Sequence, residues 1–226
     1  MTTATQELPR IGGGIYTFPE ATRIIRSVGE STSVRQLRSW MTSGLSDASF
    51  ESENGRDLLA FEDLVSLEVV RRFRLQGVSI QAIRKFDRIL RGLFPELHRP
   101  FAYKKFFTDG ADLWITEIGD DEVGTQLTGK RRGHRVWNDA IETFASQISF
   151  DDATKKATKW ALSKWIDVDP TIQFGAPVVR GTRIKVSTVM ANLSAGTHAQ
   201  VADWYGLTPE QVKGVADFAS TSRLCA

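Results

Sequence analysis

Apolar residues in the first half of the chain recur at helical spacing, in short stripes separated by turn residues. The first stripe falls within residues 17–29 and consists of Ala21, Ile24, Ile25 and Val28. A period of 3.6 residues brings these positions to one side of a helix. Thr17 and Glu20 have the spacing of a capping box, and Gly29 can close the last turn. The pattern predicts a short amphipathic helix.

A second helix is predicted over residues 33–44, with a capping box at its start and Gly44 at its end. Its apolar face comprises Val34, Leu37, Trp40 and Met41. Its polar face comprises Arg35, Gln36, Arg38, Ser39 and Thr42. Arginine offers a planar fork to phosphate or guanine, and hydroxyl groups bond to phosphate. The polar face therefore fits either a DNA-recognition helix or an ordinary solvated surface.

A β-hairpin is predicted directly after this second helix. Asn54-Gly55 is a strong two-residue turn signal, and short apolar runs lie on either side of it. The hairpin would form a small wing with Arg56 at its tip, where the guanidinium could reach a DNA backbone. Two longer apolar stripes follow, and they predict helices over residues 62–77 and 79–94.

The middle of the chain changes character. Residues 111–144 alternate apolar and polar positions between glycine-rich turns, which predicts two or three strands in a meander. One of these turns, residues 129–135, reads GKRRGHR. Its cations could contact phosphate or an acidic partner, or could form a solvated turn that protects a sheet edge. Both interpretations stay open.

The C-terminal part begins with a predicted hairpin around Gly181-Thr182, in a type II′ turn. Three short helices with good capping signals follow, as in a homeodomain-like bundle. The last of them has few cations on its exposed face, so protein contact is more plausible for it than DNA contact. Arg180 and Arg183 face each other across the hairpin, an unfavourable arrangement that Asp167 or Asp169 could relieve by pairing with one of them.

Together these elements predict an α+β fold that is mainly helical. The expected divisions are a flexible N-terminus 1–13, a winged helix-turn-helix 14–95, a β-rich connector 96–165, a C-terminal helical domain 166–222 and a tail 223–226. Residues 1–108 hold 16 Lys and Arg against 12 Asp and Glu, which gives the first half a modest positive charge. That charge is a weak indication of a phosphate-bearing partner.

The sequence contains little that suggests catalysis. Its three histidines, His98, His134 and His198, lack the spacing of a metal site. Phosphate-binding, dinucleotide-binding and serine-hydrolase motifs are absent, so we expect no enzyme activity, no metal and no cofactor. Cys225 is the only cysteine, and no apolar run is long enough to span a bilayer. We therefore expect a cytoplasmic protein with no membrane partner.

The N-terminal elements resemble the winged helix-turn-helix of MerR-type regulators over residues 14–93. The resemblance rests on the motifs VRQLRSWMTSGL and FEDLVSLEVVRRFRLQGVSIQAIR. It implies that the second helix binds DNA in the major groove while the wing contacts the backbone. The DNA-binding candidates are Arg35, Gln36, Arg38, Ser39, Thr42 and Arg56. Pro95 interrupts the chain where sensor members of that family carry a long dimerising helix.

The C-terminal motif DPTIQFGAPVVRGTRIKVSTVM resembles a small bacterial domain associated with type II toxin–antitoxin modules, over residues 165–220. Ala176 stands where a longer polar residue is common. Both halves together resemble VapB-type antitoxins, which implies a PIN-domain ribonuclease toxin as partner and repression of the antitoxin's own operon. An antitoxin arginine could pair with the metal-binding carboxylates of such a toxin. The partner-binding candidates are Arg180, Thr182, Arg183 and Arg223.

We expect operator DNA as a second partner, and a homodimer or a larger toxin–antitoxin complex as the assembly. The alternative is a MerR-like transcription regulator with no toxin, whose C-terminal domain serves dimerisation.

Overall fold

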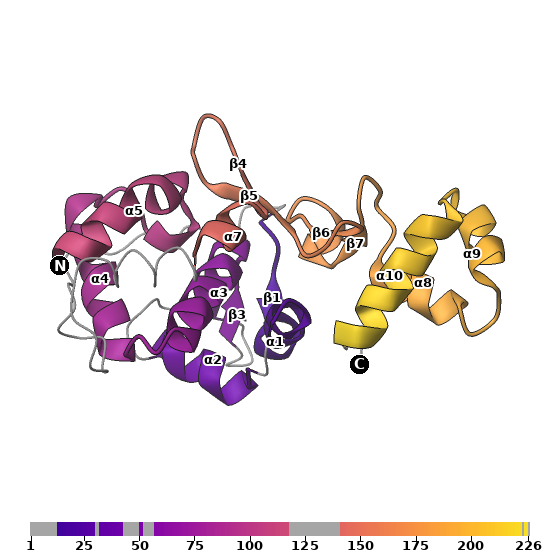
Figure 1. Cartoon of the computed structure of the whole chain (residues 1–226), viewed down its shortest axis with the longest axis horizontal. Coiled ribbons are helices and arrows are strands. Elements are labelled where there is room, and N and C mark those ends of the chain that lie inside the picture. The colour runs from indigo at the N-terminus through magenta and orange to yellow at the C-terminus, as the bar shows by residue number, and fades with distance from the viewer. Residues whose placement is uncertain are drawn as a thin grey trace.

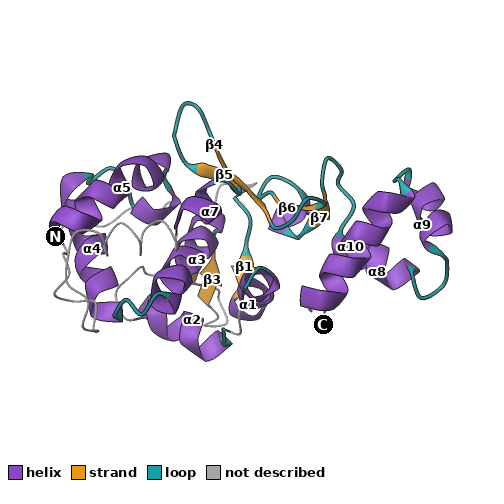
Figure 2. Ribbon diagram, viewed as in Figure 1, coloured by secondary structure: helices purple, strands orange, loops and turns teal. Residues whose placement is uncertain are grey.

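The computed structural model describes residues 13–29, 32–42, 50–51, 57–117, 141–222 and 224–225. Figure 1 shows the helices of the first half on one side, the C-terminal helices on the other, and strands β4 to β7 between them. Buried apolar side chains from both halves belong to one continuous cluster. The fold is α+β and mainly helical, as the sequence predicts (Figure 2).

The N-terminal unit begins with strand β1 (Tyr16–Thr17), helix α1 (Phe18–Ser27) and helix α2 (Val34–Trp40). Both predicted capping boxes are present: the side chains of Thr17 and Ser33 each accept a hydrogen bond from the backbone N–H three residues on. Helices α1 and α2 pack against each other, which gives the expected helix-turn-helix. Local side-chain chemistry therefore sets where both helices start.

The wing strands are also present. Strands β2 (Phe50–Glu51) and β3 (Asp57–Leu59) pair in antiparallel fashion, and β1 completes a three-stranded sheet in the order β1-β3-β2. The predicted turn at Asn54-Gly55 and the wing residue Arg56 lie outside the described residues.

Helix α3 (Phe61–Leu75) is buried on almost every side, and helix α4 (Ile80–Leu93) begins at the predicted Ser79 cap. The interior side of α3 includes a carboxylate that the apolar pattern did not indicate. Glu68 is fully buried and pairs with Arg71 and Arg72, each at 2.7 Å. A buried charge of this kind is tolerated only when it is paired and hydrogen-bonded.

The middle segment corrects one prediction. The strand expected to begin at residue 111 is instead the second half of helix α5 (Lys104–Glu117). Phe106 and Phe107 start this helix and join an aromatic cluster, with ring centroids 5.0 Å from Phe101 and 5.2 Å from Phe150 respectively. This aromatic packing favours a helix that continues through residue 117. The alternation of apolar and polar residues, which would favour a strand, is a weaker signal. The remaining predicted strands and the basic turn lie in residues 118–140, outside the described part of the chain.

The short helical turn η2 (Pro100–Ala102) lies between α4 and α5 and contacts α3, and the short helix α7 (Thr143–Ala145) precedes the next sheet. The sheet contains β4 (Ile148–Phe150), β5 (Ala157–Ala161), β6 (Ile166–Val168) and β7 (Val178–Val179), antiparallel and in that order. Trp160 of β5 is fully buried, with its ring centroid 5.3 Å from that of Phe144. Strands from the predicted connector and from the predicted C-terminal domain thus share one sheet.

Three helices complete the chain: α8 (Val186–Asn192), α9 (His198–Tyr205) and α10 (Pro209–Ser222). Thr197 and Gln200 form the predicted capping box of α9, and Gly206 ends that helix in the left-handed conformation. Within the described ranges, no helix is long and apolar enough to cross a membrane.

Candidate nucleic-acid and partner interfaces

Helix α2 separates its two faces as predicted. Leu37 and Met41 are buried, while Val34 and Trp40 are half-buried against the core. The five candidate residues of this helix, Arg35, Gln36, Arg38, Ser39 and Thr42, are all exposed. Tertiary packing of the apolar face against α1 and α3 holds the polar face toward solvent.

Several of these candidates also make contacts within the chain. The Oε1 of Gln36 accepts hydrogen bonds from the backbone N–H and hydroxyl of Ser33, at 2.8 and 3.0 Å. The guanidinium carbon of Arg38 lies 5.1 Å from the ring centroid of Phe18, a cation–π contact that joins α2 to α1. Thr42 donates its hydroxyl hydrogen to the carbonyl of Arg38 at 3.0 Å.

The side chains of Arg35 and Ser39 make no hydrogen bond or ion pair with any other described residue. They are therefore the candidates on α2 with the most freedom to meet a phosphate or a base.

Two further cations lie on α1 and were not among the predicted site residues. Arg23 and Arg26 are exposed on α1, opposite its apolar stripe. In helix-turn-helix proteins the first helix crosses the DNA backbone, where arginines can bond to phosphate. The sequence feature that could have indicated these two arginines is their three-residue spacing on the polar side of a predicted helix.

The arginines of the C-terminal loop have different environments. Arg180 pairs with Asp167, its Nε donating to Oδ1 at 3.0 Å, and its Nη2 donates to the carbonyl of Ser163 at 2.7 Å. This confirms the prediction that one of the two arginines pairs with an upstream aspartate. Asp169 instead accepts two hydrogen bonds from Thr171, at 2.6 and 2.8 Å.

The loop itself differs from the predicted type II′ turn. The backbone N–H of Thr182 donates to the carbonyl of Val179 at 3.0 Å, so Arg180 and Gly181 are the two central residues. Gly181 has φ +77° at the second central position, which is the requirement of a type II turn. The Thr182 hydroxyl closes the loop, since it donates to Val179 and accepts from the backbone of Ile184.

Arg183 is exposed, and within the described residues its side chain has no ion pair. Arg223, the fourth partner-binding candidate, lies outside the described residues. Of the predicted set, Arg183 is therefore the described cation best placed to meet a partner.

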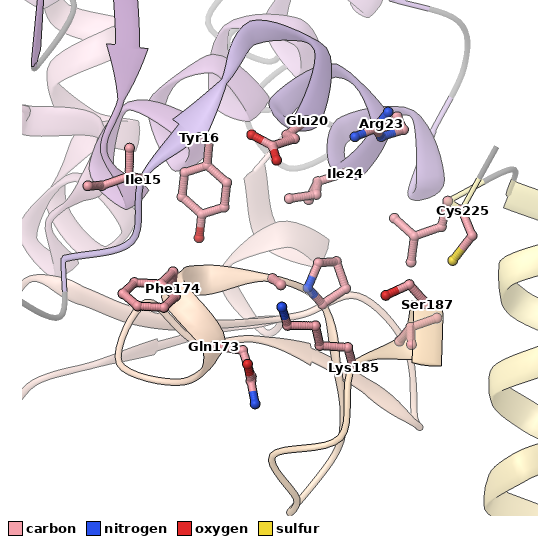
Figure 3. Close-up of a pocket in the computed structure, with 14 residues that line it drawn as sticks. Ile15, Tyr16, Glu20, Arg23, Ile24, Gln173, Phe174, Lys185, Ser187 and Cys225 are labelled. Atoms are coloured by element: carbon pink, nitrogen blue, oxygen red, sulfur yellow. The ribbon is translucent and has the colours of Figure 1, made fainter. Parts of the chain in front are cut away.

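A pocket of about 520 Å³ lies at the junction between the N-terminal unit and the C-terminal domain (Figure 3). Residues of β1 and α1 form one wall, while the segment before β7, the start of α8 and the C-terminal tail form the others. Its lining includes Ile24, Pro177 and Leu224, together with the charged side chains of Glu20, Arg23 and Lys185. Sequence reasoning did not predict this junction.

Tyr16 is buried at the junction between the N-terminal unit and the C-terminal domain. Figure 3 shows its ring pointing from β1 toward the turn that carries Phe174. Its hydroxyl is buried without a hydrogen-bond partner among the described residues. A Cβ at Gly175 would overlap this hydroxyl, and one at Gly14 would lie 3.0 Å from it. Burial, reinforced by the negative charge of nearby carboxylates, raises the pKa of Tyr16, so its phenol stays neutral.

Comparison with known proteins supports both halves of this architecture. Residues 30–88 match the family described as "MerR HTH family regulatory protein", and residues 166–219 match the family described as "Protein of unknown function (DUF433)". The chain is 33% identical over 172 residues to the protein named "Putative antitoxin VapB45" of Mycobacterium tuberculosis (strain ATCC 25618 / H37Rv), a match that covers 70% of each chain.

A solved structure shares most of this arrangement. The crystal structure of Rv2018 from Mycobacterium tuberculosis has a TM-score of 0.71 and 26% sequence identity to this chain. The match covers 89% of this chain and 96% of that one. The order of the N-terminal unit, the middle sheet and the C-terminal bundle is therefore common to both proteins.

Proposed function

Since the chain belongs to the VapB-type antitoxins, with a MerR-like helix-turn-helix at its N-terminus, we propose that it neutralises a cognate PIN-domain ribonuclease and represses its own operon. The relation to an antitoxin over 70% of both chains carries this proposal. The exposed cationic face of α2 supports the DNA-binding half of it. The protein acts by binding and not by catalysis.

Operator recognition uses the second helix of the helix-turn-helix. Arg35, Arg38 and Ser39 meet base edges and phosphates in the major groove, and Arg26 on α1 meets the flanking backbone. The wing residue Arg56 contacts the backbone beside the groove. A homodimer then reads an operator with two-fold symmetry, since each copy contributes one recognition helix.

We expect Arg38→Ala to weaken operator affinity by about 1–3 kcal/mol, because the variant loses a guanidinium that bonds to a base or phosphate. A gel shift or fluorescence anisotropy titration with the region upstream of the operon measures this. Lys213→Ala is the matched control, since Lys213 is an exposed cation on α10. Wild-type affinity in Arg38→Ala would exclude this side chain from recognition.

Toxin neutralisation is tested by co-expression with a PIN-domain ribonuclease, sought first among the products of the genes adjacent to this one. The expected result is a stable complex on size-exclusion chromatography, with restored growth of the host. A chain that binds the upstream DNA but forms no complex with the ribonuclease would instead favour a regulator whose C-terminal domain serves dimerisation.

A further inference from the structure

Three consecutive residues before β7 adopt the left-handed backbone conformation. Gln173, Phe174 and Gly175 have φ of +52°, +57° and +85°. Glycine adopts this region readily, whereas a residue with a Cβ is strained there, and a bulky one most of all. Phe174 is thus an outlier within the fold.

The surrounding structure holds this turn in place. The backbone N–H of Ile15 donates to the carbonyl of Phe174 at 3.4 Å, and that of Gly175 donates to Ile172 at 2.9 Å. The Nε2 of Gln173 donates to the carbonyl of Arg183 at 3.0 Å. These contacts hold the turn against the residue before β1 and against the loop after β7. Strain maintained by its surroundings is typical of functional positions.

The turn presents Phe174 to solvent. Its side chain is 78% exposed, the highest value among the large hydrophobic residues that the structure describes. Ile15, 44% exposed, is joined to it by the hydrogen bond from the Ile15 backbone N–H. A solvent-exposed aromatic ring on a strained backbone does not stabilise the fold. A buried contact with another molecule would give it a role, since aromatic side chains dominate binding hot spots.

Three cations lie along the pocket and the loop that adjoin Phe174. Arg23 and Lys185 line the adjacent pocket, and Arg183 lies on the loop bonded to Gln173. Among the described residues that line the pocket, Glu20 supplies the one carboxylate, and Asp169 and Glu62 lie near enough to Tyr16 to help raise its pKa. The Glu20 carboxylate already accepts from the backbone and hydroxyl of Thr17, at 2.8 and 2.7 Å. We name Ile15, Arg23, Phe174, Arg183 and Lys185, with the pocket between them, the junction face.

We propose that the junction face docks the toxin, with Phe174 inserted into an apolar recess and the cations paired with acidic groups beside it. This inference rests on the proposed antitoxin function. A PIN-domain ribonuclease, which holds its metal with clustered carboxylates, has the complementary charge. A second copy of this chain fits this face less well, because a two-fold axis through the junction face would bring Arg23, Arg183 and Lys185 of both copies together.

The test replaces Phe174 by asparagine, which tolerates the left-handed region. Relief of strain is expected to raise the Tm by about 2–4 °C. Loss of a hot-spot aromatic is expected to raise the Kd for the purified ribonuclease by about 30-fold or more. Calorimetry of the full chain against the ribonuclease measures the affinity. Leu75→Ala is the matched control, because Leu75 is 52% exposed at the end of α3 and should bind as the wild type does.

The outcomes separate the two claims. A wild-type chain that does not bind the ribonuclease overturns the proposed function, and this inference with it. A wild-type chain that binds, together with a Phe174→Asn chain that binds within about 3-fold, overturns this inference alone. A dimer that dissociates on the same substitution, with toxin affinity unchanged, would assign the face to self-association. Should Phe174→Asn lower the Tm, Phe174→Gly takes its place, since glycine adopts the same φ freely.

Discussion

Gly175→Ala is expected to lower the free energy of unfolding by about 2–5 kcal/mol. A Cβ in the left-handed region costs about 1–2 kcal/mol by itself. The new methyl group would also overlap the Tyr16 hydroxyl, and forced repacking of a filled site typically costs about 1–3 kcal/mol more. The two costs add because one concerns the backbone and the other the neighbouring ring.

Tyr16 has little room to move away from the new methyl group. It is 2% exposed and pairs with Leu59 in the β1–β3 sheet. A Cβ built at Gly14, two residues before Tyr16, lies 3.0 Å from both the Tyr16 hydroxyl and the Cβ of Pro170. Displacement of the ring would therefore disturb β1 as well as the turn. The substitution should loosen the contact between the N-terminal unit and the C-terminal domain.

Gly181→Ala is the matched control for this prediction. Gly181 has a similar φ of +77°, but a Cβ built there has no described heavy atom within 4 Å beyond its chain neighbours. We expect Gly181→Ala to lower the free energy of unfolding only by the cost of the left-handed backbone, about 1–2 kcal/mol. Chemical denaturation followed by circular dichroism compares the two variants. If both variants lose the same free energy of unfolding, the packing of Tyr16 against residue 175 does not stabilise the junction.

Local signals explain what the sequence predicted well. The helix starts at Thr17, Ser33 and Thr197 were visible because a capping box involves residues only three positions apart. The polar face of α2 followed from the same helical period. Helix α5 was missed because its second half alternates like a strand, while the aromatic packing that stabilises it involves distant residues.

The junction depends on information that the sequence does not display. Tyr16 and Gly175 are distant along the chain, and nothing local distinguishes Gly175 from the other glycines. Phe174 lies between Gln173 and Gly175, and nothing in these neighbours predicts that its ring is exposed, since aromatic residues are usually part of a core. The Arg180–Asp167 pair was one of four pairings considered, and the choice among them follows from the register of β6 and β7, in which Asp167 lies opposite Val178.

Glu68→Ala is expected to be as costly as Gly175→Ala, for an electrostatic reason. The carboxylate of Glu68 is fully buried and accepts from Arg71 Nε and Nη2 at 2.7 and 2.8 Å, and from Arg72 Nε at 2.7 Å. Removal of one partner of a buried ion pair costs about 3–5 kcal/mol, because charge remains in a poorly solvated site. The free energy of unfolding should fall by that amount.

Glu68→Ala should also weaken packing outside α3. The guanidinium carbon of Arg72 lies 4.7 Å from the ring centroid of Phe144, so the carboxylate that orients Arg72 also supports the contact with α7.

Glu96→Ala is the control, since Glu96 is exposed and surface substitutions stay within about 0.5 kcal/mol. The double variant Glu68→Leu/Arg71→Met should recover part of the loss, because apolar groups can replace a buried ion pair at little cost. A single variant within about 1 kcal/mol of the wild type would contradict this account, and would mean that water reaches the guanidiniums inside the N-terminal core.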